Sequence, residues 1–540
     1  MKKINAILFA IAISMNWISH SQITLEVLKD INVSGESYAS HFKIYNDKMY
    51  FTADDGENGK ELWRTDGTEG GTGLFFEFNP VGTSYTKVLG EVGGELFVGA
   101  ATSDFDVELW KTDGTESGTE LVKDIRIGTG GSDPIWLGEI DGKMYFAAFD
   151  GIVGDELWVT EGTEASTNLL KDIQPGLSGS EPRFLLDFNN EIYFSANDGI
   201  HGFEIWKTDG SIVNTVMLKD VNEGSLHGSP LHIIEFGGKI YFSGKNATEG
   251  EELWISDGTE EGTVSFMDIN SSGSSYPSDF TVYNDKLYFR ADDGIHGTEL
   301  WVTDGTVEGT QMLIELRPGG GFLGGAAPRS LVVAGGTLFF QANSGEDGDH
   351  DLELWKTNGF PDGTVRVKDI NPTGSSSPSK LIKYGNKIYF KAWDGTNGNE
   401  LWYSDGTEEG TQKVTPVDGE NVNPLGDTEF FFEFDGSIYF IGNYNELDKE
   451  IWKLTDETAS IEKTDVTLDF KVYPNPASDI LYITSKGEIE AIKIINLSGK
   501  IIQTSKGTGA LSIRDLSPGV YFVQVRINGK LSVAKFIKNH

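Results

Sequence analysis

The sequence predicts an all-β protein built from one repeated sheet, and three observations support that fold class. The segment 61–68, ELWRTDGT, recurs along the chain, and its tryptophan returns as Trp63, Trp110, Trp158, Trp206, Trp254, Trp301, Trp355, Trp402 and Trp452. Successive tryptophans are 47, 48, 48, 48, 47, 54, 47 and 50 residues apart, a period typical of propellers and other repeat architectures. The segments between them are short, rich in β-branched and aromatic residues, and bounded by turn residues, without a helical pattern of adequate length.

Each repeat contains four strand-like segments. Examples are residues 121–125 for the first type, 280–283 for the second and 286–289 for the third, and the fourth is the Glu-Leu-Trp segment itself. Pairs such as Asn284-Asp285 suit a tight hairpin turn between the second and third segments. Links rich in Gly, Ser and Pro join the first segment to the second, so we expect a blade to run second, third, fourth, first.

The two ends of the array predict how it closes. A lone first-type segment at 25–31 precedes the first repeat, and the array ends with a fourth-type segment at 450–453. The N-terminal strand can therefore complete the last blade and remove the exposed sheet edges. We predict that residues 22–456 form one β-propeller of four-stranded blades, about nine repeats, closed by the N-terminal strand. Since nine exceeds the usual four to eight blades, other groupings of the blades remain open at this point.

Composition and the N-terminus predict the compartment. The chain has 43 Lys and Arg against 83 Asp and Glu, a net charge of −40, which disfavours nucleic acid and anionic membranes as partners. It has no cysteine, so disulfides and thiolate chemistry are excluded. Lys2 and Lys3 precede an apolar run at 4–18, and residues 1–21 have the pattern of a secretory signal peptide cleaved after Ser21. No later segment is apolar enough to span a membrane, so we expect no transmembrane segment in the mature chain.

The repeat resembles a known family. Copies at 61–72, 108–119, 252–263, 299–310 and 400–411 all read Glu-Leu-Trp-x-x-Asp-Gly-Thr followed by Gly-Thr. This pattern is similar to the secreted bacterial proteins named after that string. The resemblance implies secretion and no assigned reaction.

Residues 457–466 read as a polar linker, and residues 467–540 as a small antiparallel β-sandwich. The second segment resembles the sorting domain of the type IX secretion system through residues 473–478, 496–500, 516–523 and 535–538. That resemblance implies recognition of residues 467–540 by the type IX machinery, translocation across the outer membrane and removal of the domain. We therefore expect a protein that is secreted or held on the outer surface of a Gram-negative bacterium.

Two repeated side chains have both structural and functional interpretations. The tryptophans could stack on sugars, but packing between blades is favoured. The aspartate of Asp-Gly-Thr could bind a metal, but capping of its own turn is favoured.

A Gly-bent loop, Asp-Gly-x-x-Gly-x-Glu, precedes the tryptophan strand. Its carboxylates could hold calcium, which prefers oxygen ligands, although two carboxylates do not supply the six to eight oxygens that calcium takes. The alternative is an aspartate that caps its own turn. The candidate metal residues are Asp55, Glu61, Asp150, Glu156, Asp198, Glu204, Asp293, Glu299, Asp394 and Glu400.

We expect recognition at the end of the ring where these loops and the Gly/Ser/Pro links meet, because loops on a rigid scaffold often carry function. Insertions at 317–329 and 344–352 fall there. The favoured function is binding or adhesion to an extracellular glycan, polymer or protein, and the alternative is a polysaccharide hydrolase or lyase. We predict no catalytic residue. The one close histidine pair, His227 and His232, lacks the spacing of a zinc motif.

Overall fold

The structure is a computed structural model, and it divides the chain into two compact units, Met1–Ala459 and Ser460–His540. It describes residues 23–103, 105–319, 324–345, 351–396, 398–414, 424–425, 431–444, 449–458, 470–473, 477–485, 489–496, 501–505, 510–514, 516–517, 519–527 and 530–539. The predicted signal peptide (1–21) and most of the predicted linker (457–466) lie outside these residues.

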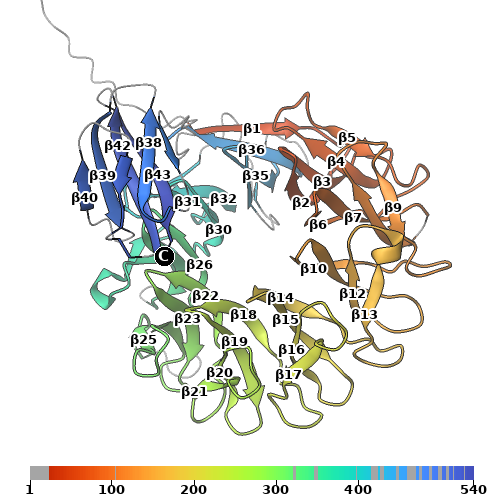
Figure 1. Cartoon of the computed structure of the whole chain (residues 1–540), viewed down its shortest axis with the longest axis horizontal. Coiled ribbons are helices and arrows are strands. Elements are labelled where there is room, and N and C mark those ends of the chain that lie inside the picture. Colours follow the sequence, from red (N-terminus) through yellow and green to blue (C-terminus); the bar gives the residue numbers. More distant parts are fainter. Residues whose placement is uncertain are drawn as a thin grey trace, which may run out of the picture. The chain divides into compact units, whose positions relative to one another are not determined.

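The first unit consists of nine four-stranded antiparallel sheets around an axis (Figure 1). Blade one consists of β2 (Ser40–Tyr45), β3 (Lys48–Asp54), β4 (Lys60–Thr65) and β5 (Gly73–Phe76). Blade two consists of β6 (Lys87–Val92), β7 (Glu95–Ala101), β8 (Val107–Thr112) and β9 (Glu120–Lys123). Blade three consists of β10 (Ile135–Ile140), β11 (Lys143–Ala148), β12 (Glu156–Thr160) and β13 (Asn168–Lys171). Blade four consists of β14 (Arg183–Phe188), β15 (Glu191–Asn197), β16 (Phe203–Thr208) and β17 (Val216–Lys219). Blade five consists of β18 (Leu231–Phe236), β19 (Lys239–Asn246), β20 (Gly250–Ser256) and β21 (Val264–Met267). Blade six consists of β22 (Ser278–Tyr283), β23 (Lys286–Asp292), β24 (Thr298–Thr303) and β25 (Gln311–Ile314). Blade seven consists of β26 (Arg329–Ala334), β27 (Thr337–Asn343), β28 (Leu352–Thr357) and β29 (Val365–Lys368). Blade eight consists of β30 (Ser379–Tyr384), β31 (Lys387–Trp393), β32 (Asn399–Ser404) and β33 (Gln412–Lys413). Blade nine consists of β34 (Phe431–Phe434), β35 (Ser437–Gly442), β36 (Glu450–Asp456) and β1 (Ile23–Lys29).

The order of strands within a blade agrees with the prediction. In each blade the first strand of the list is innermost, and neighbouring inner strands such as β2 and β6, or β26 and β30, lie against each other. The two single-turn 3-10 helices, η1 (Glu164–Ser166) and η2 (Pro361–Gly363), occupy turns between a fourth-type and a first-type strand.

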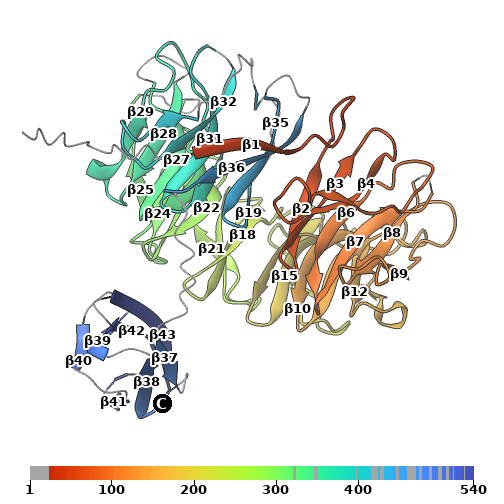
Figure 2. The same cartoon turned by 90° about the horizontal axis from the view of Figure 1, so that it is seen from above.

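The N-terminal strand closes the ring, which confirms the predicted propeller and its closure. Strand β1 pairs antiparallel with β36, with Ile23 opposite Asp456 and Val27 opposite Trp452, and Figure 2 shows the two strands side by side. One apolar cluster joins the last blade to the first, since Phe51 of β3 packs in the same core as Ile451 of β36.

The repeated tryptophans are core residues. Eight of the nine are between 2% and 8% exposed, and Trp110 is half-buried. Trp158 of blade three packs with Leu109 and Val122 of blade two, and its ring centroid lies 6.4 Å from that of Phe146. The tryptophans therefore fill the space between blades, as favoured from the sequence.

We expect Trp301→Ala to lower the free energy of unfolding by about 3–5 kcal/mol, through lost burial and the cavity left behind. Trp393→Ala is the matched control, because the Trp393 side chain is 42% exposed and its loss should cost less than about 1 kcal/mol. Urea unfolding followed by circular dichroism measures both. Equal losses in the two variants would contradict a packing role.

The Asp-Gly-Thr segment forms a structural turn. In the first blade the Thr65 hydroxyl lies 2.7 Å from the Thr72 hydroxyl and accepts a hydrogen bond from the Gly67 N–H at 2.9 Å. The Asp66 carboxylate accepts the Thr68 N–H at 3.0 Å. Gly67 has φ +87°, and a Cβ there would lie 2.8 Å from the Tyr439 hydroxyl of the last blade, so this position requires glycine.

The second unit is a small β-sandwich, as predicted. Its sheets are β37-β38-β41 and β40-β39-β42-β43, and its core contains Leu481, Ile494, Val523 and Phe536. The strands are β37 (Phe470–Tyr473), β38 (Ile480–Ser485), β39 (Ile489–Asn496), β40 (Ile501–Ser505), β41 (Ala510–Ser512), β42 (Gly519–Ile527) and β43 (Lys530–Lys538). Part of the predicted sorting motifs, at 474–476, 497–500 and 518, lies outside the described residues. In the described part of the chain, no helix is long and apolar enough to cross a membrane.

Candidate binding face

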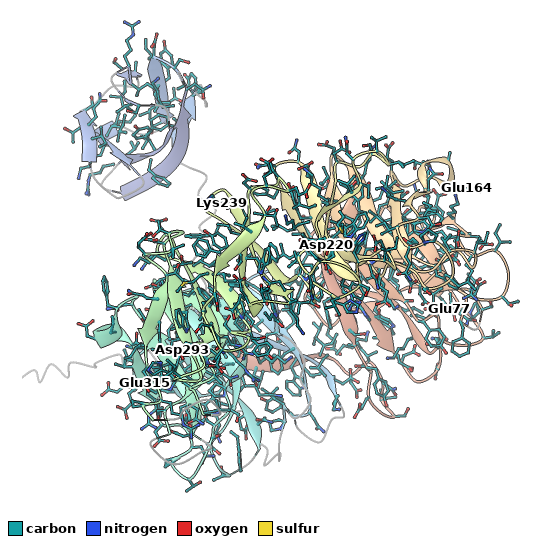
Figure 3. The ribbon with its side chains drawn as sticks, turned by 90° about the horizontal axis from the view of Figure 1, so that it is seen from below. Glu77, Glu164, Asp220, Lys239, Asp293 and Glu315 are labelled. Atoms are coloured by element: carbon teal, nitrogen blue, oxygen red, sulfur yellow. The ribbon has the colours of Figure 1, made fainter. Side chains whose placement is uncertain are left out.

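The two ends of the propeller differ in the kind of connection they carry. At the tight-turn end, the Tyr45 hydroxyl donates to the Gly94 carbonyl in the hairpin turn of the next blade, at 2.7 Å. At the loop-rich end, the Lys60 N–H donates to the hydroxyl of Thr83, which lies in the link to the next blade. Figure 3 shows Asp293 and Glu315 of the loop-rich end lying away from Lys239, which begins β19 at the tight-turn end.

The glutamate before each tryptophan fastens the link to the blade. Glu252 is fully buried, and its carboxylate accepts the N–H groups of Ile269 at 2.8 Å and Ser275 at 2.9 Å, and the Ser275 hydroxyl at 2.6 Å. Among the described residues, the equivalents that accept backbone N–H groups of their own links are Glu61, Glu108, Glu156, Glu204, Glu299, Glu353 and Glu450. Glu400 is buried at the same position and lies 4.0 Å from the Lys413 ammonium group. These carboxylates hold the loop-rich end in place.

The aspartates six residues earlier cap their own loops. Asp198 accepts the N–H groups of Ile200 and His201 at 2.8 and 2.7 Å, and its second oxygen lies 2.6 Å from the His201 ring. Asp55, Asp150, Asp293 and Asp394 accept N–H groups of their own loops in the same way. In the regions that the structure describes, no three His, Asp or Glu side chains are grouped so that they could hold a metal.

Calcium at these Asp/Glu pairs stays a prediction. It is tested by comparing the melting temperature of extensively dialysed protein with and without added calcium. A rise in melting temperature with calcium is expected if the pairs bind the ion, and an unchanged value would exclude it.

The buried glutamates predict that stability falls with rising pH. Burial raises the pKa of Glu252 from 4.5 to about 7, so the folded state holds a proton that the unfolded state has released. The stabilisation is fully present below pH 4.5 and is lost as the pH rises through about 7. Between pH 5.5 and 8 this one group should lower the free energy of unfolding by up to about 2 kcal/mol.

Glu252→Gln removes this titration, so its unfolding free energy should fall less between pH 5.5 and 8 than that of the wild type. Glu260→Gln, in the exposed turn of the same blade, is the matched control and should follow the wild type. Urea unfolding at the two pH values measures the difference. A Glu252→Gln variant that also follows the wild type would contradict the assignment.

A ring of short segments at the loop-rich end surrounds the propeller axis, and we call it the axial rim. Each segment runs from two residues before an inner strand to the second residue of that strand. The segments are 38–41, 85–88, 133–136, 181–184, 229–232, 276–279, 327–330 and 377–380. Their first residues all have positive φ, from 45° at Glu181 to 50° at Tyr85.

A β-bulge turns a second side chain of six rim segments outward. These residues also have positive φ, between 55° and 58°, and none is glycine: His41, Phe184, His232, Asp279, Ser330 and Lys380. Bulges of this kind re-aim side chains and are common beside functional sites. Because the residue type changes from blade to blade at one backbone position, the rim departs from the symmetry of the repeat.

The rim carries exposed aromatic rings that the sequence analysis missed. Tyr38, Phe184 and Tyr276 are 54%, 46% and 58% exposed. Phe105, 68% exposed, stacks on Tyr85 of the rim with ring centroids 5.2 Å apart. The signal in the sequence is weak: at the first rim position, Tyr38, Tyr85 and Tyr276 stand where other repeats have Asp, Glu, Ser or Ala.

A pocket of about 120 Å³ opens in the rim between blades four and five. It is lined by Arg183, Phe184, Ser195, Phe203, Ser229 and Leu231. The Arg183 guanidinium lies 4.2 Å from the centre of the Phe203 ring and pairs with Glu181 at 2.6 Å. The His227 ring stacks on the Phe203 ring of this pocket with centroids 5.4 Å apart, and its Nδ1 accepts the Phe203 N–H at 3.0 Å.

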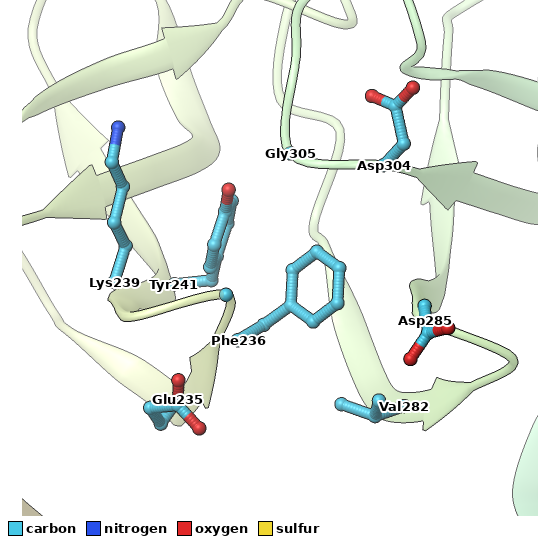
Figure 4. Close-up of a pocket in the computed structure, with 9 residues that line it drawn as sticks. Glu235, Phe236, Lys239, Tyr241, Val282, Asp285, Asp304 and Gly305 are labelled. Carbon is cyan, nitrogen blue, oxygen red and sulfur yellow. The ribbon is translucent and has the colours of Figure 1, made fainter. Parts of the chain in front are cut away.

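A second hollow, of about 480 Å³, lies at the tight-turn end between blades five and six (Figure 4). Phe236 and Tyr241 form its apolar wall, and Asp285 and Asp304 border it from the next blade. It is made of hairpin turns that recur in every blade, whereas the rim differs from blade to blade.

The comparisons identify the C-terminal unit. Residues 471–539 match the family model of the secretion system C-terminal sorting domain. This unit is a sorting domain. The sorting domain indicates recognition by the type IX secretion machinery and places the protein outside the cell or on the outer surface of a Gram-negative bacterium.

The propeller is similar to several solved structures at low identity. The extracellular domain of a one-component system from B. thetaiotaomicron is 10% identical, with 95% of this chain and 74% of that chain covered and a TM-score of 0.31. A puromycin hydrolase is 13% identical over 76% of this chain and 59% of that chain, with a TM-score of 0.36. Sqt1 of Saccharomyces cerevisiae is 13% identical over 81% and 97%, with a TM-score of 0.35. No curated protein matches the chain.

Proposed function

We propose that the protein is an extracellular binding protein whose propeller recognises a glycan through the axial rim. The observation that carries the proposal is the set of exposed aromatic rings there, Tyr38, Phe105, Phe184 and Tyr276. Exposed aromatic residues are energetically costly to leave in water and mark recognition surfaces when they gather. Their flat faces can pack against the apolar faces of sugar rings, while the polar groups beside them can bind sugar hydroxyls.

The rim is also built rigidly enough to present these rings. Buried glutamates such as Glu252 fasten the links from which the rim segments start. Tyr276 is followed by Pro277, and the same pairing with proline occurs at Asp133, Glu181, Ser229, Ala327 and Ser377, which limits the backbone further. A rigid site loses less entropy on binding.

The alternative function, a polysaccharide hydrolase or lyase, requires two acidic groups in unlike environments at one place. The buried glutamates of the propeller are equivalent from blade to blade and already accept backbone N–H groups. A glycan ligand without turnover is therefore the better supported function. The resemblance of the repeat to the Glu-Leu-Trp-x-x-Asp-Gly-Thr family is consistent with a secreted binding protein and adds no reaction.

The test is a binding screen against immobilised glycans, run with an assay for soluble sugar products. Tyr276→Ala should weaken binding to any recognised glycan about fivefold or more, because an aromatic contact of this kind contributes roughly 1 kcal/mol. Phe360→Ala is the matched control: Phe360 is 64% exposed but lies in a turn at the tight-turn end. Equal binding by both variants would contradict recognition at the rim, and released sugar products would favour the enzyme.

A further inference from the structure

We infer that the glycan bound at the axial rim is an acidic polysaccharide that carries carboxylates, such as a polyuronate. The inference rests on the proposed function and adds the chemical class of the ligand. It comes from the distribution of charge between the two ends of the propeller, which the sequence composition hides.

Basic residues outnumber acidic ones at the rim, although the whole chain has 83 acidic and 43 basic residues. The acidic residues in the rim segments are Asp133, Glu181 and Asp279. The basic residues in these segments are Lys87, Arg183, Arg329 and Lys380. Lys60 and Arg290 lie directly against the rim, as do the acidic residues Asp155 and Glu251. On a protein of net charge −40, this concentration of cations favours an anionic ligand at the rim, while the acidic surface elsewhere repels it.

Three neighbouring blades, six to eight, each place a cation in or directly against the rim. The Arg290 guanidinium on β23 donates to the Ser278 hydroxyl of the rim at 2.8 Å and lies 3.5 Å from the Asp279 carboxylate. It lies close enough to Arg329 of the next blade for the two charges to repel, and burial together with this repulsion lowers the pKa of Arg290. Lys380 follows on blade eight, where the bulge turns its exposed side chain outward. An anionic ligand would relieve the repulsion between these cations.

Cations also lie beside aromatic rings on the other side of the rim. The Lys60 ammonium group lies 5.2 Å from the centre of the Tyr38 ring, and His41 lies near enough to Lys60 and Lys87 for both to lower its pKa, after burial. Lys87 also pairs with Asp133 at 3.8 Å. A polymer with a sugar ring for each aromatic face and a carboxylate for each cation fits this arrangement.

The opposite ends of the same inner strands are acidic. The next-to-last residues of the inner strands, at the tight-turn end, include Glu91, Glu139, Asp187, Glu235 and Glu433, all exposed, against one basic residue, Lys383. The tight-turn end of the axis is therefore more acidic than the rim. An acidic polymer is attracted to the rim and repelled from the other end, which gives the ring one binding face.

Carboxylates are the anions that this rim suits best. Arginine presents a planar fork that can bind a carboxylate through two parallel hydrogen bonds, and Arg183 donates one hydrogen bond to the Glu181 carboxylate beside the pocket, at 2.6 Å. Nucleic acid also combines anions with stackable rings. Nucleic acid is therefore treated as an outcome of the test.

The test is isothermal titration calorimetry of the mature protein at two salt concentrations. The four ligands are polygalacturonate, neutral galactan, dextran sulfate and single-stranded DNA. We expect polygalacturonate to bind more tightly than the other three, and less tightly at high salt. Arg329→Gln with Lys380→Gln should weaken that binding roughly tenfold, at about 0.7 kcal/mol for each exposed charge contact.

The matched control is Lys286→Gln with Lys383→Gln, which removes the same charge from the tight-turn end; Lys383 lies three residues from Lys380 on β30. It should bind within about twofold of the wild type, a change close to the thermal energy. Equal loss in both double variants, or tighter binding of dextran sulfate or DNA, would overturn the inference. Binding of galactan as tight as that of polygalacturonate, still sensitive to Tyr276→Ala, would overturn the acidic ligand and leave the proposed glycan function standing. Binding insensitive to Tyr276→Ala would overturn both.

Discussion

Deletion of residues 23–31 is expected to abolish cooperative folding of the propeller. The deletion removes the β1–β36 ladder, the burial of Leu28 and Ile31, and the hydrogen bond from the Ile31 N–H to Glu450 at 3.2 Å. Each buried aliphatic side chain contributes about 2–5 kcal/mol, while a folded protein is stable by only about 5–15 kcal/mol. The deletion also exposes the edge of β36, which invites aggregation.

A circular permutant tests whether residues 23–31 act by closing the ring or only by being present at the N-terminus. Ile23 lies opposite Asp456 in the ladder, so a short Asn-Gly turn after Asp456 can lead directly into residues 23–31, and the chain can begin at Asn32. The permutant should regain most of the wild-type melting temperature in calorimetry. A deletion variant that unfolds like the wild type, or a permutant that stays as unstable as the deletion, would contradict closure by β1.

Deletion of residues 467–540 is expected to stop transport across the outer membrane, so that the protein accumulates in the periplasm. The sorting-domain match covers 471–539, and this unit has its own core, which includes Leu481 and Phe536. Cell fractionation with immunoblotting measures the distribution. Two controls complete the test: the truncated protein should keep the melting temperature of its propeller, and residues 467–540 fused to a periplasmic reporter should export it. An unchanged extracellular fraction would contradict the role of the domain.

The sequence predicted the scaffold because the scaffold repeats. Trp63 and its equivalents must fill the same gap in each blade, and Gly67 must adopt the same positive φ, so the period shows where each blade begins and turns. The lone strand at the N-terminus predicted the closure for the same reason. The last repeat lacked a first-type strand, and the N-terminal first-type strand lacked a blade.

The candidate site was harder to predict because it depends on departures from the repeat. The loop carboxylates recur as equivalent pairs, but Glu61 is turned into the blade by the N–H groups of Phe78 and Asn79, which lie 17 and 18 residues further along the chain. The exposed bulge residues, such as Phe184 and Lys380, have positive φ although neither is glycine or asparagine, so no local propensity reveals their direction. A repeated proline, as in Glu181-Pro182 and Tyr276-Pro277, was a second signal in the sequence.

Hydrogen exchange of the backbone amides, measured with and without saturating polygalacturonate, tests the central claim that the rim is the recognition site. Slower exchange is predicted in the rim segments, above all at 276–279, 327–330 and 377–380, with unchanged exchange in the tight turns at 66–72 and 304–310. Protection at the tight turns or at the hollow beside Phe236 and Tyr241, with the rim unchanged, would contradict the claim.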